Sequence, residues 1–157
     1  MMAVTVGRVE WEEPRHGLPW RVDRSSGSPL GNPFCLTRGL WGYEADAERE
    51  ASVEAYRALL LETTKGHLWY LPADGWWEVP WRVAEVGFEH GFYGRVAGWN
   101  WEGARSELRE ILHVARYVDI ELRCWCVPRK CHGHCIAGWV EGQRAHEALF
   151  PDELPSL

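Results

Sequence analysis

The stretch Val118-Asp-Ile-Glu-Leu-Arg-Cys-Trp-Cys-Val-Pro-Arg-Lys-Cys-His-Gly-His-Cys135 decides the fold. Its first half alternates apolar and polar residues, with Ile120 and Leu122 on one face, as is typical of a β-strand. After Gly133, apolar residues recur at helical spacing. The stretch therefore predicts a strand that leads through a cysteine-rich loop into a helix, a unit from which α/β sheets are built.

Further elements are expected on the N-terminal side of this unit. Residues 3–9 are short and β-branched, as in a first strand, whereas residues 12–33 are rich in Pro, Gly and Ser and predict a loop. Asp46 as an N-cap, followed by periodic apolar residues, predicts a helix that ends near Thr63. A second helix is expected after Asn100, which is a suitable cap.

These elements predict an α/β protein with a small parallel or mixed sheet flanked by helices, in a single Rossmann-like domain over residues 1–150. Residues 151–157 are interpreted as a C-terminal tail. Residues 65–102 are interpreted as a Trp-rich insertion. Its tryptophans would serve either for packing or as a stacking platform for a base or a sugar.

Composition narrows the class of function. A net charge of −6 argues against a general nucleic-acid-binding surface, because neutralising phosphates needs clustered Lys and Arg. There is no apolar run of membrane-spanning length and no secretory signal, so we expect a cytoplasmic protein without membrane contacts. Four of the five cysteines lie in residues 124–135. In a reducing compartment this clustering indicates metal or thiol chemistry rather than disulfides.

The first interpretation of the cluster is a metal site, because soft thiolate and imidazole ligands suit zinc. Zinc would be held by Cys126, Cys131 and His132, with Cys124, His134 or Cys135 as a further ligand. The spacing of Cys124 and Cys126, two apart on a strand, departs from the usual Cys-x2-Cys pair. A different interpretation makes Cys124 and Cys135 ordinary core residues, because cysteine is often buried.

The remaining interpretation is a small-molecule site, because ligands of open α/β sheets bind beyond the carboxyl ends of strands. Cys126 or Cys131 would be a thiolate nucleophile and His132 the acid/base. Arg129 and Lys130, beside a helix N-terminus, would contact a phosphate or carboxylate.

The segment Cys124-Trp-Cys-Val-Pro-Arg-Lys-Cys-His-Gly133 with its following helix resembles the signature of domain-of-unknown-function family 4326, found in bacteria and bacteriophages. Gly31-Asn-Pro-Phe34, preceded by Arg24, and Tyr56-Arg57 resemble two further elements of that family. His134 stands where the family usually has Asp, so no carboxylate role is carried over. The resemblance implies a compact α/β fold of bacterial or phage origin, and it supplies no activity.

We therefore expect a cytoplasmic protein, in the host cytoplasm if phage-encoded, that acts as an enzyme on a nucleotide, nucleoside or related phosphorylated metabolite. Arg24 and Asn32 would orient that ligand. The alternative is a zinc-stabilised protein-interaction module whose Trp-rich surface binds a host protein. The sequence leaves a homo-oligomer and a monomer equally open.

Overall fold

The computed structural model describes residues 2–10, 17–34, 42–65, 99–126, 129 and 131–151. Within these ranges the chain forms one parallel sheet, a short 3-10 helix and three α-helices. In chain order the elements are β1 (Val4–Arg8), β2 (Leu18–Arg21), η1 (Arg24–Ser26), α1 (Gly42–Lys65), α3 (Trp101–Val114), β3 (Ile120–Cys124) and α4 (His132–Leu149). The α/β class and the parallel sheet are confirmed.

Strand β3 is the centre of the sheet, whose strand order is β1-β3-β2. It pairs in parallel with both neighbours, and Leu122 lies opposite Val6 on β1 and Trp20 on β2. All five β3 residues are buried. The polar residues of this strand are therefore paired rather than solvated, and Glu121 accepts an ion-paired hydrogen bond from Arg123 at 3.0 Å.

Strand β2 lies in the region that the sequence predicts as loop, so that prediction is wrong for residues 18–21. The strand is short and lies at the sheet edge, and Leu18 is exposed. Pro19 is compatible with an edge, where a backbone N–H is not needed by a neighbouring strand. A short, largely exposed edge strand has no strong hydrophobic alternation, which is why the sequence did not reveal it.

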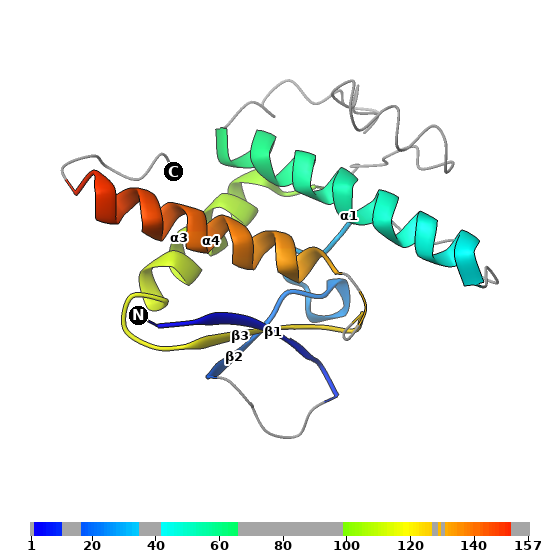
Figure 1. Ribbon diagram of the computed structural model, residues 1–157, viewed down its shortest axis with the longest axis horizontal. Helices are drawn as coiled ribbons and strands as arrows, with labels where there is room; N and C mark the ends of the chain where they lie inside the picture. The colour runs from blue at the N-terminus through cyan, green and yellow to red at the C-terminus, as the bar shows by residue number, and fades with distance from the viewer. Residues whose placement is uncertain are drawn as a thin grey trace.

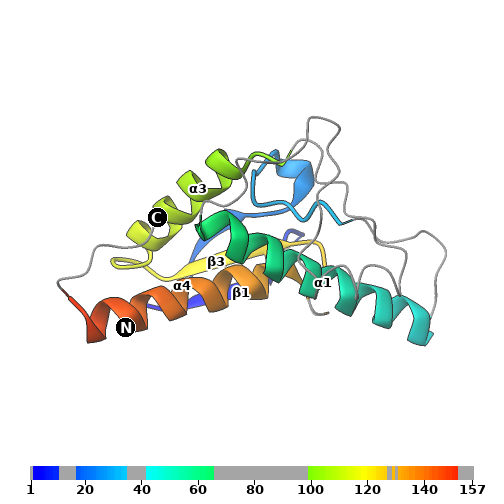
Figure 2. The same ribbon diagram turned by 90° about the horizontal axis from the view of Figure 1, so that it is seen from above.

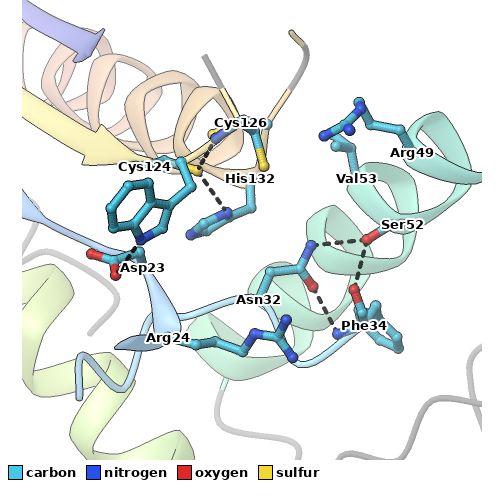
Figure 3. Close-up of a pocket in the computed structure, with 12 residues that line it drawn as sticks. Asp23, Arg24, Asn32, Phe34, Arg49, Ser52, Val53, Cys124, Cys126 and His132 are labelled. Atoms are coloured by element: carbon cyan, nitrogen blue, oxygen red, sulfur yellow. Dashed lines mark hydrogen bonds between the residues drawn. The ribbon is translucent and has the colours of Figure 1, made fainter. Parts of the chain in front are cut away.

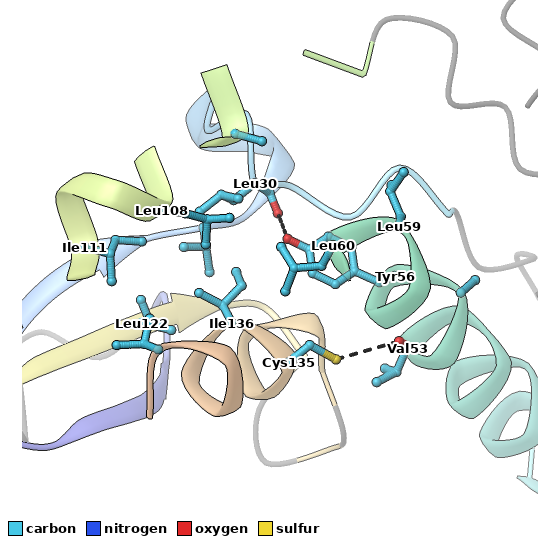
Figure 4. Packing of buried hydrophobic residues seen from close by; sticks show 14 of the residues in the cluster. Leu30, Val53, Tyr56, Leu59, Leu60, Leu108, Ile111, Leu122, Cys135 and Ile136 are labelled. Carbon is cyan, nitrogen blue, oxygen red and sulfur yellow. Dashed lines mark hydrogen bonds between the residues drawn. The ribbon is translucent and has the colours of Figure 1, made fainter. Parts of the chain in front are cut away.

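The three helices lie on one side of the sheet, above it in Figure 1 and in front of it in Figure 2. Helix α4 packs on β1 and β3, while α1 and α3 pack against α4. The apolar core fills the space between the sheet and the helices, with Leu122, Ile136 and Leu108 fully buried in it (Figure 4). A Rossmann-like fold has helices on both faces, so within the described ranges that description stays a prediction.

The helix boundaries partly follow the sequence signals. The Asn100 side chain accepts a hydrogen bond from the backbone N–H of Gly103 at 2.9 Å, which confirms this predicted cap. Helix α1, however, begins at Gly42, so Asp46 is inside the helix and is not its cap. Carboxylates favour the whole first part of a helix through its dipole, and therefore they do not mark one starting residue.

The strand predicted from Val118 begins only at Ile120. The backbone N–H of Val118 still bonds to the carbonyl of Val114, at 3.1 Å, so this residue closes the last turn after α3. None of the helices in the described part of the chain is long and apolar enough to cross a membrane.

Most of the predicted Trp-rich insertion, residues 66–98, lies outside the described residues, as do residues 152–157 of the predicted tail. Two tryptophans at the insertion's C-terminal end are described. Trp99 is buried, donates to Thr63 Oγ1 at 3.1 Å, and packs edge-on against Tyr56. Trp101 packs against the same core. The domain boundaries themselves stay predictions.

Candidate functional site

The site lies at the carboxyl edge of the sheet, where β2 runs into Val22 and Asp23 and β3 ends at Cys124. A cavity of about 250 Å³ opens there. Figure 3 shows the cysteines and His132 on one side of it, facing α1 on the other. The lining residues come from five segments of the chain: Asp23, Arg24, Asn32, Phe34, Arg49, Ser52, Val53, Cys124, Trp125, Cys126, Cys131 and His132.

Three cysteine side chains meet at the cavity wall. Cys124 and Cys131 are buried and Cys126 is half-buried. The backbone N–H of Cys126 donates to Cys124 Sγ at 3.4 Å. Cys131 is the N-cap of α4, and its Sγ accepts a hydrogen bond from the N–H of Gly133 at 3.1 Å. The end of β3 and the start of α4 therefore bring the three thiols to one wall of the cavity.

His132, the first residue of α4, is held from both sides. Its Nε2 lies 2.7 Å from the carbonyl oxygen of Val22, and its Nδ1 lies 3.8 Å from Cys124 Sγ. Because a carbonyl oxygen only accepts hydrogen bonds, Nε2 must carry the proton. The Nδ1 lone pair of the neutral ring then faces the thiols. Burial lowers the pKa of His132, which keeps the ring neutral near pH 7.

The donor atoms of Cys124, Cys131 and His132 all lie within 4.8 Å of one another, so this cluster could hold a metal ion. The two other predicted ligands point elsewhere. Cys135 Sγ contacts the Val53 carbonyl oxygen at 3.7 Å, in the core (Figure 4). His134 is exposed, and its Nδ1 accepts from the N–H of Cys131 at 3.3 Å as part of a capping box.

The close packing of the three thiols separates their pKa values. Hydrogen bonds from Cys124 and Cys131 hold the pKa of Cys126 far below its usual range, aided by the nearby charge of Arg49 and opposed by burial. The hydrogen bond to Cys126 raises the pKa of Cys124 to about 11. Hydrogen bonds to Cys124 and Cys126, together with burial, raise the pKa of Cys131. The contacts among the thiols therefore favour ionisation of the half-buried Cys126 over ionisation of Cys124 or Cys131.

The opposite side of the cavity is polar and cationic. Arg24 follows β2, and Arg49 extends from α1. The Nε of Arg49 is buried and has no hydrogen-bond partner among the described residues. An unsatisfied buried donor of this kind is costly. Arg49 also lines the cavity, where its guanidinium group can donate to an acidic ligand.

Asp23 is the acidic residue in the lining, and its charge is already compensated. Arg21 donates to both carboxylate oxygens, at 2.9 and 2.8 Å, and Ser25 donates to one of them. Trp125 Nε1 donates to the same carboxylate at 3.1 Å. Burial by itself would raise the pKa of Asp23, but these hydrogen bonds outweigh it and the pKa lies well below its usual range.

Asn32 lines the cavity mainly as a structural residue. Its Oδ1 accepts from the backbone N–H of Phe34 at 2.9 Å, and its Nδ2 donates to Ser52 Oγ at 2.9 Å. Ser52 in turn donates to the Phe34 carbonyl at 3.1 Å. The Gly-Asn-Pro-Phe segment is thereby fastened to α1, which explains its compact turn, and Asn32 keeps one amide N–H and one oxygen lone pair for a ligand.

The structure brings together most, but not all, of the residues that the sequence singled out. Those that line one cavity are Arg24, Asn32, Cys124, Cys126, Cys131 and His132. Arg129 is exposed and is not among the lining residues, although its N–H closes a turn on the Cys126 carbonyl at 2.9 Å. Lys130 lies outside the described residues.

Sequence reasoning missed the contribution of α1, above all Arg49 and Ser52. A signal was present, because Arg49, Ser52, Val53 and Tyr56 follow the i, i+3, i+4, i+7 spacing of one helix face. Tyr56 packs edge-on against the His132 ring, with centroids 4.9 Å apart, and donates to the Leu30 carbonyl at 2.7 Å. The face of α1 that carries these four residues therefore points toward the site.

Comparison with known proteins identifies a family to which the chain is similar. A family model described as "Domain of unknown function (DUF4326)" matches residues 2–142 of the 157-residue chain. Neither a curated protein nor a solved structure matches significantly.

Proposed function

The chain belongs to the DUF4326 family, and we propose that it binds a nucleotide, nucleoside or related phosphorylated metabolite in the cavity at the carboxyl edge of its sheet. One observation carries the proposal. Two arginines, Arg24 and Arg49, line a small cavity of a chain whose net charge is −6. Placing cations in one hollow of an acidic protein favours an anionic ligand.

The charged residues that line the cavity favour an anionic ligand. Asp23 is engaged by Arg21, Ser25 and Trp125, so its negative charge does not oppose a ligand at full strength. Arg49 lines the cavity, and a phosphate oxygen there could accept hydrogen bonds from its guanidinium group. Arginine suits this role because its planar guanidinium donates several hydrogen bonds to phosphate oxygens.

The position of the cavity also favours an anionic ligand. Parallel strands β2 and β3 both end at it, and the N-terminal residues of α4, Cys131 and His132, form part of its wall. Ligands of parallel α/β sheets bind beyond the carboxyl ends of strands, and the positive end of a helix dipole favours anions there.

Trp125 accounts for the nucleoside part of the proposed ligand. Its side chain is 47% exposed and lines the cavity, while its Nε1 is anchored to Asp23 at 3.1 Å and Ser25 at 3.2 Å. An indole ring held in this way presents a surface on which a base can stack.

The catalytic roles predicted for Cys126, Cys131 and His132 stay predictions, and the binding proposal does not depend on them. The geometry favours a fixed role for His132 over proton transfer, because Nε2 is occupied by the Val22 carbonyl and the ring is buried. The alternative of an interaction module built on the Trp-rich insertion has no support in Trp99 and Trp101, which pack against the core.

The test is ligand binding, measured by calorimetry and thermal shift with inorganic phosphate, ribose 5-phosphate, nucleosides and nucleoside mono- and diphosphates. We expect phosphorylated compounds to raise the melting temperature, and nucleotides to bind more tightly than ribose 5-phosphate. Arg49→Ala and Arg24→Ala should each weaken nucleotide binding by roughly tenfold or more, because each removes a charge-assisted hydrogen bond. Trp125→Ala should remove the advantage of nucleotides over ribose 5-phosphate.

Arg109→Ala is the matched control, because Arg109 is an exposed arginine of α3 that does not line the cavity. It should leave binding unchanged. Binding that survives in an Arg24→Ala/Arg49→Ala double variant, or a wild-type chain that binds no phosphorylated compound, would refute the proposal.

A further inference from the structure

The wall of the cavity carries a ligand set that the binding of a phosphorylated metabolite does not use. Cys124 ends β3, Cys126 follows it by two residues, and Cys131 and His132 begin α4. We propose that these four residues bind one zinc ion through three sulfur atoms and His132 Nδ1. Three cysteines with one histidine are among the standard combinations of structural zinc sites.

The distances fit a tetrahedral site. With Zn–S of about 2.3 Å and Zn–N of about 2.0–2.1 Å, neighbouring ligand atoms are roughly 3.6 Å (S to N) and 3.8 Å (S to S) apart. Cys124 Sγ and His132 Nδ1 are 3.8 Å apart. The donor atoms of Cys124, Cys131 and His132 all lie within 4.8 Å of one another, so small side-chain rotations would bring these three to bonding distance from one ion.

The orientation of His132 is the strongest part of the argument. Zinc-bound histidines almost always donate their other ring N–H to a carboxylate or a backbone carbonyl, which sets the tautomer and aims the free nitrogen at the metal. Here Nε2 lies 2.7 Å from the Val22 carbonyl oxygen, and Nδ1 faces Cys124. Tyr56 packs edge-on against the ring and holds its plane.

Cys126 is the fourth ligand because its backbone N–H contacts Cys124 Sγ at 3.4 Å and its side chain lines the same cavity, so that a rotation of this side chain brings its sulfur to the ion. The fold also explains why the other two nearby candidates are excluded. Cys135 is directed to the Val53 carbonyl, and His134 is occupied in capping α4. Zinc at this place joins the end of β3 to the start of α4. It therefore holds together the two chain segments, Cys124–Cys126 and Cys131–His132, that form one wall of the cavity.

The experiment is metal analysis of the full-length protein, expressed in zinc-supplemented medium and purified without chelator or phosphorylated ligand. We expect about one zinc per chain, retained through gel filtration. Cys124→Ser, Cys126→Ser, Cys131→Ser and His132→Ala should each lose bound zinc. His132→Cys should retain it, because a set of four cysteines also binds zinc.

Cys135→Ser is the matched control, a buried cysteine of the same helix outside the proposed set, and it should keep its zinc. If the serine variants fail to fold, Co²⁺ titration of the chelator-treated wild type decides the question. Visible bands of tetrahedral Co²⁺ together with thiolate-to-cobalt charge transfer are the expected result. Wild-type protein without zinc and without these bands overturns the site, and loss of zinc from Cys135→Ser overturns the ligand set.

The outcome is independent of the proposed ligand. Arg24→Ala and Arg49→Ala, which should lose nucleotide binding, are expected to keep full zinc content. A chain that binds zinc and no phosphorylated compound would therefore refute the proposed function alone, and the reverse result would refute the zinc site alone.

Discussion

At the scale of single residues, Asp23 links the edge strand to the rim of the cavity. It follows β2 directly, and its carboxylate accepts from Arg21, Ser25 and Trp125. Trp125 is more than a hundred residues away along the chain, so one carboxylate fastens the end of β3 to the segment after β2. The buried Asp23 carboxylate therefore fixes the orientation of the exposed Trp125 indole.

Asp23→Asn should lower the free energy of unfolding by about 1–3 kcal/mol at pH 7, because the hydrogen bonds made to an ionised carboxylate are weakened. The folded-state pKa of Asp23 lies below its unfolded value of about 3.9. Its stabilising effect is therefore fully present above pH 4 and is lost as the pH falls through the folded pKa. Denaturant melts of both proteins between pH 7 and pH 3 should show the difference shrinking.

Asp119→Asn serves as the control for this prediction. The exposed Asp119 Oδ1 accepts one hydrogen bond, from the N–H of Ala3 at 2.7 Å, and an amide oxygen can accept it too. Asp119→Asn should lower the free energy of unfolding by less than Asp23→Asn does at every pH. A difference between Asp23→Asn and wild type that is constant from pH 7 to pH 3 would contradict the assignment.

At the scale of elements, the ends of strands and helices position the site. The carboxyl ends of β2 and β3 and the N-terminus of α4 converge, and the other lining residues come from the turn at Asn32 and from α1. Helix α3 does not reach the cavity, but it supports β2 and the following turn. Glu107 on α3 accepts from Trp20 Nε1 at 2.9 Å and from Ser28 Oγ.

The cap of α3 provides a test at this scale. Asn100→Ala should lower the free energy of unfolding by about 1 kcal/mol, because the Gly103 N–H loses its side-chain acceptor at the first turn. Asn100→Asp keeps an acceptor and adds a favourable charge near the helix N-terminus, so it should be neutral. Equal destabilisation by both substitutions, measured by urea denaturation, would show that the cap is not what stabilises the helix.

At the scale of the whole molecule, one core joins the sheet to all three helices. Leu122 on the central strand, Leu108 on α3 and Ile136 on α4 are fully buried in the same cluster, together with Tyr56 of α1. Tyr56 also touches His132, so the core and the thiol cluster are continuous. A substitution that disturbs the packing of the core should therefore also disturb the thiol cluster.

Leu122→Ala should cost about 2–5 kcal/mol through lost burial and the cavity left behind. We expect circular dichroism and tryptophan fluorescence to report the same unfolding midpoint, because one core is shared. Leu149→Ala is the control, since Leu149 is 74% exposed at the end of α4 and should change stability by less than about 0.5 kcal/mol. Two separate midpoints in Leu122→Ala would argue against a single cooperative core.

The features that the sequence predicted correctly are those set by neighbours along the chain. Strand β3, helix α4 and the Asn100 cap follow from residues a few positions apart. The sequence did not predict the edge strand β2, because the stability of this strand does not come from its own residue pattern. It comes from hydrogen bonds to β3 and its neighbours, such as the one from the Val22 N–H to the Arg123 carbonyl at 3.0 Å.

By itself, then, the sequence determined the α/β class and placed a cysteine–histidine cluster between a strand and a helix, because periodicity and capping are local. Only the tertiary structure decided which residues share that site. Cys124 joins Cys131 and His132 although it was a core candidate, Cys135 turns to Val53, and Arg49 enters from a helix that sequence reasoning had left out. The packing of α1 and α4 on one face of the sheet sets these contacts, and spacing along the chain does not encode them.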